Sequence, residues 1–272
     1  MEKKVGSPAN MQNFINDALH AIPVFISSLF IFAQTTNPVH PPFIIPSPAP
    51  PPITTLLTTG DVMLGRSVHT KSLKEKDLNY PFLKIQPILS TADITLINLE
   101  NPFIDPCPNT DTGMKFCAPT NTVAALQWAG VDVANLANNH TQNFGQEGYL
   151  STKNSLSNSE IKISDSEKLA IIEKNKIKFG FIGFDMVTYP RQDIQNVIAK
   201  SKQLVDVLVV SFHWGWEYSE KPNYLQKEIA TKAVNSGADV IVGHHPHVIQ
   251  PIEVIDNTPI VYSHGNLIFD QP

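Results

Sequence analysis

From Thr54 to the end, the chain alternates short apolar runs with amphipathic stretches. The apolar runs are rich in β-branched residues and nearly continuous, a pattern typical of strands buried on both faces of an α/β sheet. We predict strands in residues 54–61, 92–100, 131–139, 177–184, 205–215, 238–245 and 259–269. The alternation of strands and helices predicts an α/β domain.

Helical periodicity occupies several of the intervals between these runs. Residues 120–130 and 223–237 are two examples, and each ends in a glycine, Gly130 or Gly237, where a helix would stop before the next strand. In the second stretch, the apolar residues predicted to share one face are Leu225, Ile229, Ala233 and Val234.

The segment before Thr54 has a different character. An uncharged apolar run at 21–33 follows Lys3 and Lys4. The run is shorter than the roughly 20 apolar residues that span a bilayer, and its length suits the core of a signal peptide. A buried core helix fits poorly, because proline-rich sequence follows at once. We therefore predict export, with cleavage or retention as an anchor left open.

Residues 37–52 are so rich in proline that they predict an extended, semi-rigid tether. The predicted organisation is a signal peptide or N-terminal anchor at 1–34, a proline-rich linker at 35–53 and one domain at 54–272. The chain carries a formal net charge of -5, and no basic stripe stands out. This charge argues against nucleic acid as a partner.

The two cysteines, Cys107 and Cys117, flank a short polar segment rich in turn residues. In an exported protein, such a pair favours a disulfide bond. A two-cysteine zinc site is the alternative, but the tight Cys-x-x-Cys spacing of such sites is missing. We predict a structural disulfide.

Polar residues gather at the carboxyl ends of nearly all the predicted strands. Ligands bind at this edge of open α/β sheets, so these side chains are expected to converge. The strand-end residues are Asp61, Asn98, Glu100, Asn138, Asn139, His140, His213, His244, His245, His247, His264, Asn266 and Asp270. Taken singly, a strand-end aspartate is more often a turn or helix cap than a ligand.

Carboxylate, amide and imidazole groups together suit Zn, Mn or Fe. Two such ions about 3.5–4 Å apart activate water and hold a phosphoryl group. If the backbone at His245 and His247 is extended, as Pro246 between them favours, the two side chains point to the same side. His244 would then face the other way, with a supporting role. Glu100 is the candidate bridge between two ions.

Six ordered motifs carry a family resemblance: "TGDVMLGR", "NLENP", "LANNH", "FHWGWEY", "GHHPHVIQP" and "YSHGNLIFDQ". Together they resemble the CapA family of capsule and poly-γ-glutamate biosynthesis proteins, which is similar in fold to the calcineurin-like metallophosphoesterases. The resemblance covers Thr54 to Gln271. It implies a four-layer α-β-β-α sandwich of metallophosphoesterase type, with one or two divalent transition metal ions (Mn, Zn or Fe) at the strand ends.

The resemblance also assigns roles to residues. His140 matches the histidine that polarises the leaving group. Arg66, in the first loop, is a candidate contact for an anionic group of the substrate, with an ordinary surface arginine as the alternative. The implied metal ligands are Asp61, Glu100, Asn139, His213, His245 and His247. The phosphoesterase pattern has a histidine where this chain has Met63, which weakens one of the two metal positions.

These observations leave three functional hypotheses. The first is an exported metal-dependent hydrolase of phosphoesterase type, with His140 as general acid. The second changes the chemistry to amide bonds of an anionic polymer such as poly-γ-glutamate. The third is a metal-containing accessory protein that helps to assemble or export that polymer. Under all three, the expected partners are the anionic polymer and membrane-bound capsule synthesis proteins.

Overall fold

The computed structural model describes residues 53–271. The predicted leader and all of the predicted linker except Ile53 lie outside the described residues. In the described part, no helix combines the length and the apolar character needed to cross a bilayer.

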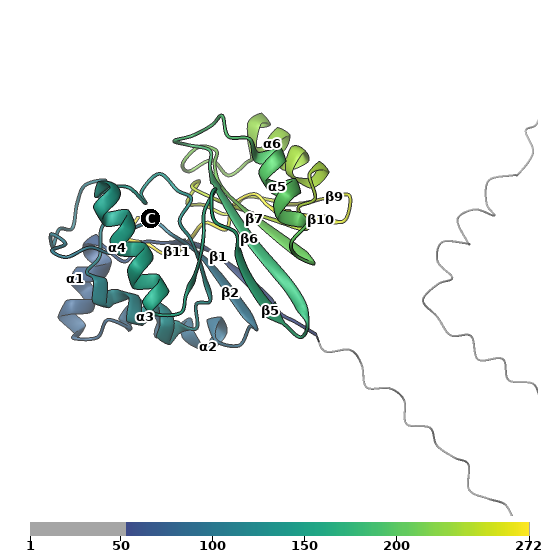
Figure 1. The fold of residues 1–272 in the computed structure, drawn as a ribbon. Helices are drawn as coiled ribbons and strands as arrows, with labels where there is room; N and C mark the ends of the chain where they lie inside the picture. Colours follow the sequence, from purple (N-terminus) through teal and green to yellow (C-terminus); the bar gives the residue numbers. More distant parts are fainter. Residues whose placement is uncertain (1–52, 272) are drawn as a thin grey trace, which may run out of the picture. The chain divides into compact units, whose positions relative to one another are not determined.

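A five-stranded sheet forms one half of the domain, and all of its strands are parallel (Figure 1). Its order is β11-β1-β2-β3-β4. The strands are β1 (Leu56–Val62), β2 (Ile94–Leu99), β3 (Val133–Asn135), β4 (Lys162–Ser164) and β11 (Asn266–Ile268). Every residue of β2 is buried, as expected for a strand covered on both faces.

A six-stranded sheet forms the other half, in the order β5-β6-β7-β8-β10-β9. Its strands are β5 (Ala170–Lys174), β6 (Ile177–Asp185), β7 (Val207–His213), β8 (Val240–His244), β9 (Ile252–Ile255) and β10 (Thr258–Val261). The four central strands are parallel, and β5 and β9 pair antiparallel at the two edges.

Helices cover the outer face of each sheet (Figure 1). On the first sheet these are α1 (Arg66–Glu75), α2 (Gln86–Leu89), α3 (Val123–Ala129) and α4 (Gly145–Asn158), with short 3-10 helices at Tyr80–Phe82 and Thr120–Thr122. On the second they are α5 (Ile194–Lys202) and α6 (Tyr224–Asn235).

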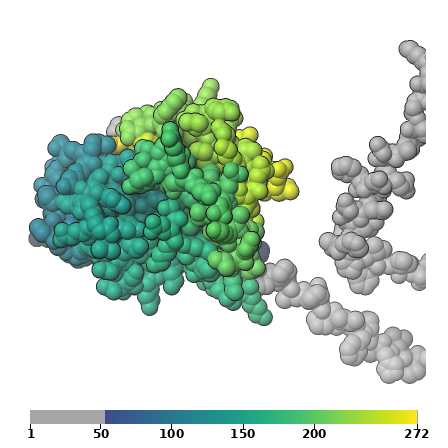
Figure 2. All heavy atoms as spheres, turned by 45° about the horizontal axis from the view of Figure 1, so that its top comes forward, coloured from purple at the N-terminus to yellow at the C-terminus, as the bar shows by residue number. Residues whose placement is uncertain are grey.

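Three apolar clusters hold these layers together. Two lie between a sheet and its helices, and the third joins the two sheets through residues such as Leu96, Phe181 and Val209. In the space-filling view, the teal first half and the green-to-yellow second half pack directly against each other (Figure 2). The predicted four-layer α-β-β-α architecture is confirmed.

The predicted strand at 259–269 is wrong as a single element. Its first part is β10 of the six-stranded sheet and its last part is β11 of the five-stranded sheet. The chain crosses between the sheets at Ser263–Gly265, where Gly265 has a φ of 69°. Strands β4, β5 and β9 were not predicted, because they are three to five residues long and carry charged residues.

The helix predicted at 223–237 is present as α6. On its predicted face, Ala233 is buried, and Ile229 and Val234 are partly buried against the same apolar cluster. Leu225 departs from the prediction because it is 61% exposed, whereas the polar Gln226 is buried. Gln226 forms a capping box with Asn223: each side chain accepts a hydrogen bond from the other's backbone N–H. Gly130 and Gly237 both have positive φ and follow their helices as predicted.

Strand register brings the polar strand ends into rows. In the first sheet, Asp61 pairs with Asn98 on one side and with Asn266 on the other. In the second sheet, His213 pairs with both Asp185 and His244. Because the strands are parallel, these residues share one edge of their sheets.

Candidate metal centre

Asp61, near the end of β1, lies at the centre of the polar cluster. Its Oδ1 accepts a hydrogen bond from Asn98 Nδ2 at 2.9 Å and lies 3.0 Å from His244 Nδ1. Its Oδ2 accepts the backbone N–H of His245 at 3.2 Å and lies 3.2 Å from His247 Nδ1. This one carboxylate therefore joins the first sheet to the histidine segment that follows β8.

The backbone of that histidine segment is not extended, contrary to the prediction. Strand β8 ends at His244, and both His245 and His247 have positive φ, at 93° and 59°. The two rings nevertheless lie near each other, with centroids 6.0 Å apart, because the turn brings both toward Asp61. His244 does not face away, since its Nδ1 contacts the same carboxylate and supports it.

Glu100 and His213 meet on the other side of Asp61, and both are fully buried. His213 Nδ1 lies 3.6 Å from Glu100 Oε1, and His213 Nε2 lies 2.9 Å from Asn139 Oδ1. Asn98 joins the two acids, because its Nδ2 donates to both Asp61 and Glu100. The six predicted metal ligands are thus linked by direct contacts or through Asn98.

Two fully buried carboxylates in one cluster are electrostatically costly. In the described part of the chain, their ion-pair partners are histidines. Burial and the Asp61 charge raise the pKa of Glu100 well above its usual range. Burial also acts to raise the pKa of Asp61, but hydrogen bonds with His244 and His247 hold it well below its usual value.

The two neighbouring carboxyls therefore differ in how readily they ionise, and a bound cation would favour the ionised form of both. Glu100 Oε2 and His245 Nδ1 are buried and have no hydrogen-bond partner. Burial lowers the pKa of His213 well below its usual value and lowers that of His245, so both imidazoles are neutral, as metal ligands must be. These residues fit a divalent transition metal.

Ligand-atom positions define two groups of three residues that could hold an ion. Asp61, Glu100 and His213 form the inner group, and Glu217, His245 and His247 form the outer group. Within each group, the ligand atoms lie within 4.8 Å of one another. The sequence did not assign a role to Glu217 or to Asn98, although Asn98 lies at a predicted strand end and Glu217 lies within "FHWGWEY".

His140, the predicted general acid, is held by two neighbours. Its Nδ1 lies 3.1 Å from Asn143 Oδ1, and its ring stacks on Phe116 with centroids 4.1 Å apart. A carbonyl oxygen accepts but cannot donate, so Nδ1 carries a proton and Nε2 is the atom left to exchange one. Burial lowers the pKa of His140.

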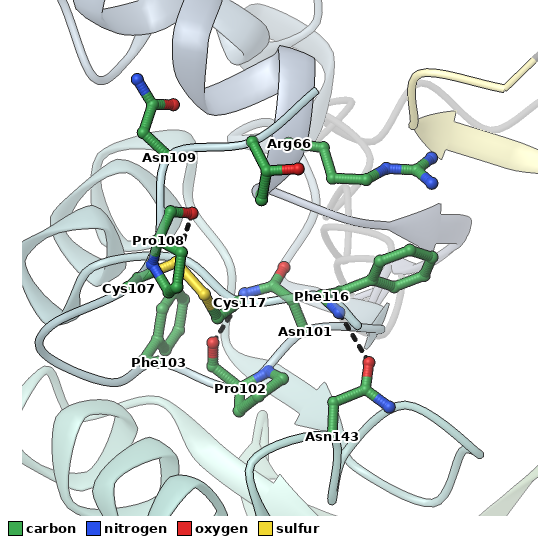
Figure 3. The surroundings of a disulfide bond; sticks show 12 residues. Arg66, Asn101, Pro102, Phe103, Cys107, Pro108, Asn109, Phe116, Cys117 and Asn143 are labelled. Carbon is green, nitrogen blue, oxygen red and sulfur yellow. Dashed lines mark hydrogen bonds between the residues drawn. A yellow bond between two sulfur atoms is a disulfide. The ribbon is translucent and has the colours of Figure 1, made fainter. Parts of the chain in front are cut away.

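A disulfide bond closes the loop that presents Phe116 (Figure 3). Cys107 and Cys117 are bonded, with Cα atoms 5.9 Å apart, and this confirms the prediction. The backbone N–H of Phe116 donates to Asn143 Oδ1 at 2.7 Å, so one amide oxygen contacts both the loop and His140.

Arg66 lies next to this loop, but its guanidinium already has partners. It forms a buried ion pair with Asp270, donates to the backbone oxygen of Gly113 at 2.8 Å and lies over the Phe116 ring (Figure 3). These contacts satisfy much of the group's hydrogen-bonding capacity. Its predicted role in substrate binding stays a prediction, and the contacts point to structural support of Phe116.

Residues 55–271 match the family described as "Bacterial capsule synthesis protein PGA_cap". The chain belongs to this family. The matched residues include both sheets and all the predicted metal ligands.

Two of the chain's similar proteins come from Bacillus species. The chain is 32% identical to "PGA biosynthesis protein CapA" of Bacillus subtilis (strain 168), over 78% of this chain and 62% of that protein. It is 30% identical to "Capsule biosynthesis protein CapA" of Bacillus anthracis, over 80% of this chain and 60% of that protein. The matched part of the chain thus spans about three-fifths of these relatives.

One solved structure supports the fold. The crystal structure of a hypothetical protein from Thermus thermophilus has a TM-score of 0.52 at 15% identity, covering 78% of this chain and 76% of that one. At this identity, the similarity supports the fold alone and carries no information about the chemistry of the site.

Proposed function

We propose that this chain is an exported, metal-dependent hydrolase of phosphoesterase type that acts in capsule or poly-γ-glutamate biosynthesis at the cell surface. The names of the two Bacillus relatives support the process. The observation that carries the hydrolase proposal is the convergence of carboxylate, amide and imidazole groups around the buried Asp61.

A divalent ion held by the inner group would polarise a phosphoryl oxygen and lower the pKa of a water molecule. The chain's own residues supply the remaining functions. Asn143 holds the Nδ1 proton of His140, so Nε2 is the atom that would take up a second proton from water and then donate it to the leaving oxygen. Phe116 covers one face of the imidazole and fixes its plane.

A cavity of about 830 Å³ beside the cluster offers room for a substrate. Asn138, Asn139, Asp185 and Arg191 are among its lining residues. The Asp185 carboxylate accepts the backbone N–H groups of Val187 and Thr188, so it is engaged in its own loop. Arg191 is exposed, and we assign to it the contact with an anionic group that the sequence assigned to Arg66.

The test uses the full chain, stripped of metal and reloaded with Mn, Zn or Fe. Hydrolysis of bis(p-nitrophenyl) phosphate is compared with cleavage of poly-γ-glutamate. We expect metal-dependent release of nitrophenol that His140→Ala slows without changing the metal content. Arg191→Ala should raise KM and leave kcat nearly unchanged. Cleavage of poly-γ-glutamate alone would replace the phosphoesterase proposal by the amide-bond chemistry.

A non-enzymatic accessory role is the second candidate, and Met63 favours it. This residue is fully buried, and its sulfur accepts a hydrogen bond from the Gly65 N–H at 3.1 Å. A potential nitrogen ligand is thus replaced by a thioether whose sulfur already accepts a backbone hydrogen bond. Metal binding without turnover of either substrate would support this role.

The proposed cell-surface location draws support from two features. The apolar run at 21–33 has the length of a signal-peptide core, and the disulfide between Cys107 and Cys117 is typical of oxidising compartments. Fractionation of cells that express the full chain with a C-terminal tag tests the location. Recovery of the chain in the cytosol with reduced cysteines would contradict it.

A further inference from the structure

The position of Met63 leaves the cluster one nitrogen ligand short of the pattern that the phosphoesterases show. An ion beside Asp61 would then depend on fewer protein ligands, and a second ion nearby would need ligands of its own. Glu217 lies on the loop after β7 and is the acidic member of the outer group, where its carboxylate faces His245 and His247.

We infer that Glu217, together with His245 and His247, holds a second divalent ion beside the inner group. The inference rests on the metal use proposed above and adds a residue to it. The two positions are neighbours: His247 Nδ1 is 3.2 Å from Asp61 Oδ2, and the rings of His213 and His245 are 4.8 Å apart. A carboxylate with two imidazoles is a donor set that suits Zn, Mn or Fe.

The loop that carries Glu217 is fastened to the histidine segment by its backbone. The N–H of Trp214 donates to the His244 oxygen at 3.1 Å, and the N–H of Tyr218 donates to the Pro246 oxygen at 2.8 Å. These bonds lie on either side of Glu217 in the sequence. They hold its backbone beside His245 and His247 with no ion required.

A buried glutamine pair supports the far end of the same loop. Gln250 Nε2 donates to the Ser219 oxygen at 2.7 Å, and Gln226 Nε2 donates to Gln250 Oε1 at 2.9 Å. Gln226 and Gln250 are both buried, so the loop is anchored to α6 and to the segment before β9. Hydrogen bonds within the protein therefore fix the backbone position of Glu217.

The two groups differ in their exposure to solvent. Asp61, Glu100 and His213 are fully buried, whereas Glu217 is exposed. An ion in the inner group is shielded from water, and an ion in the outer group shares a boundary with solvent. We therefore expect the outer ion to bind more weakly, to exchange faster and to be the one that incoming substrate reaches.

The experiment is a metal titration of the full chain after removal of metal with a chelator. Calorimetry with Zn or Mn, together with elemental analysis, gives the number of ions and the affinity of each. We expect two ions of unequal affinity for the wild type. Glu217→Gln should keep the tighter ion and weaken the other by at least about 10-fold.

Glu220→Gln is the matched control, because it removes the same charge from an exposed residue three positions along. It should bind both ions as the wild type does, and Glu217→Asp should restore part of the lost affinity. Two ions with unchanged affinities in Glu217→Gln would overturn the inference, as would a wild type that binds a single ion. Either result is compatible with the proposed hydrolase function. A wild type that binds no metal would contradict both the inference and the proposed function.

Discussion

The ring of His140 lies against the ring of Phe116, with centroids 4.1 Å apart and planes inclined by 27°. Phe116 is the residue next to Cys117, so the disulfide loop and the predicted general acid meet at this contact. Arg66 covers the same phenyl ring from above, 4.6 Å from its centroid. A residue from an irregular loop thus fixes the plane of a catalytic candidate on another segment.

Replacing Phe116 by Leu should slow turnover more than it weakens substrate binding. Leucine fills much of the space but cannot stack, so the imidazole gains freedom to leave the line of proton transfer. We expect kcat to fall about 10-fold, equivalent to about 1.4 kcal/mol, with KM changed less than about twofold. Steady-state kinetics on the substrate that the wild type hydrolyses measures both constants.

Phe116→Tyr is the control, since it keeps the ring and should retain most of the turnover. Metal content should be the same in all three proteins. Equal kcat values for the leucine variant and the wild type would show that the stack has no part in positioning His140.

Arg66→Met should destabilise the fold. The Arg66 and Asp270 side chains are 8% and 10% exposed, and losing one partner leaves a buried charge unpaired. We expect the free energy of unfolding to fall by about 3 kcal/mol, measured by urea denaturation. The double variant Arg66→Met, Asp270→Leu should recover part of this loss. Native stability together with a raised KM would instead favour the substrate-binding role that the sequence predicted.

The Arg66–Asp270 pair also predicts a pH dependence. Burial acts to raise the pKa of Asp270, but hydrogen bonds from Arg66 and Ser67 outweigh it and lower the pKa below 3.8. A lowered carboxyl pKa stabilises the fold above the unfolded-state value and ceases to do so as pH falls through the folded-state value. The stability difference between the wild type and Asp270→Asn should therefore persist at pH 6 and shrink below about pH 4. A difference that grows as the pH falls would contradict this sign.

Much of the fold could be predicted because its central strands are long, apolar runs. The predicted strand at 92–100 contains β2, and its fully buried pattern reflects helices on one face and a second sheet on the other. Residues 259–269 were wrongly predicted as one strand, because apolar periodicity does not reveal where a chain leaves one sheet for another. The crossing depends on Gly265 and on the pairing of β11 with β1, which is a long-range contact.

In the candidate site too, some features follow from local sequence and others depend on long-range contacts. The strand-end positions of Asp61 and His213 follow from local sequence, since parallel strands share an edge. The backbone conformation of His245 and His247 could not be predicted in this way. Their positive φ values accompany contacts with Asp61, which lies in the other sheet. Glu217 could not be placed from the sequence, since its loop is fixed by a hydrogen bond between Tyr218 and Pro246.

Removing the disulfide should lower stability. Replacing both Cys107 and Cys117 by serine frees a loop closed over a separation of ten residues. We expect a loss of about 2–3 kcal/mol in the free energy of unfolding, because the unfolded chain gains conformational freedom. Urea denaturation of the oxidised wild type, the reduced wild type and the double variant measures this loss. The latter two should agree, and a reduced wild type as stable as the oxidised form would contradict the structural role.

The central claim is that the polar cluster around Asp61 binds a divalent transition metal, and its most direct test is the metal content of the folded full chain. Elemental analysis after reloading with Mn, Zn or Fe and removal of free metal should find one or two ions per chain. His245→Ala and Asp61→Asn should both reduce that number, with circular dichroism confirming that each variant is folded. A folded wild type that retains no metal under these conditions would contradict the account.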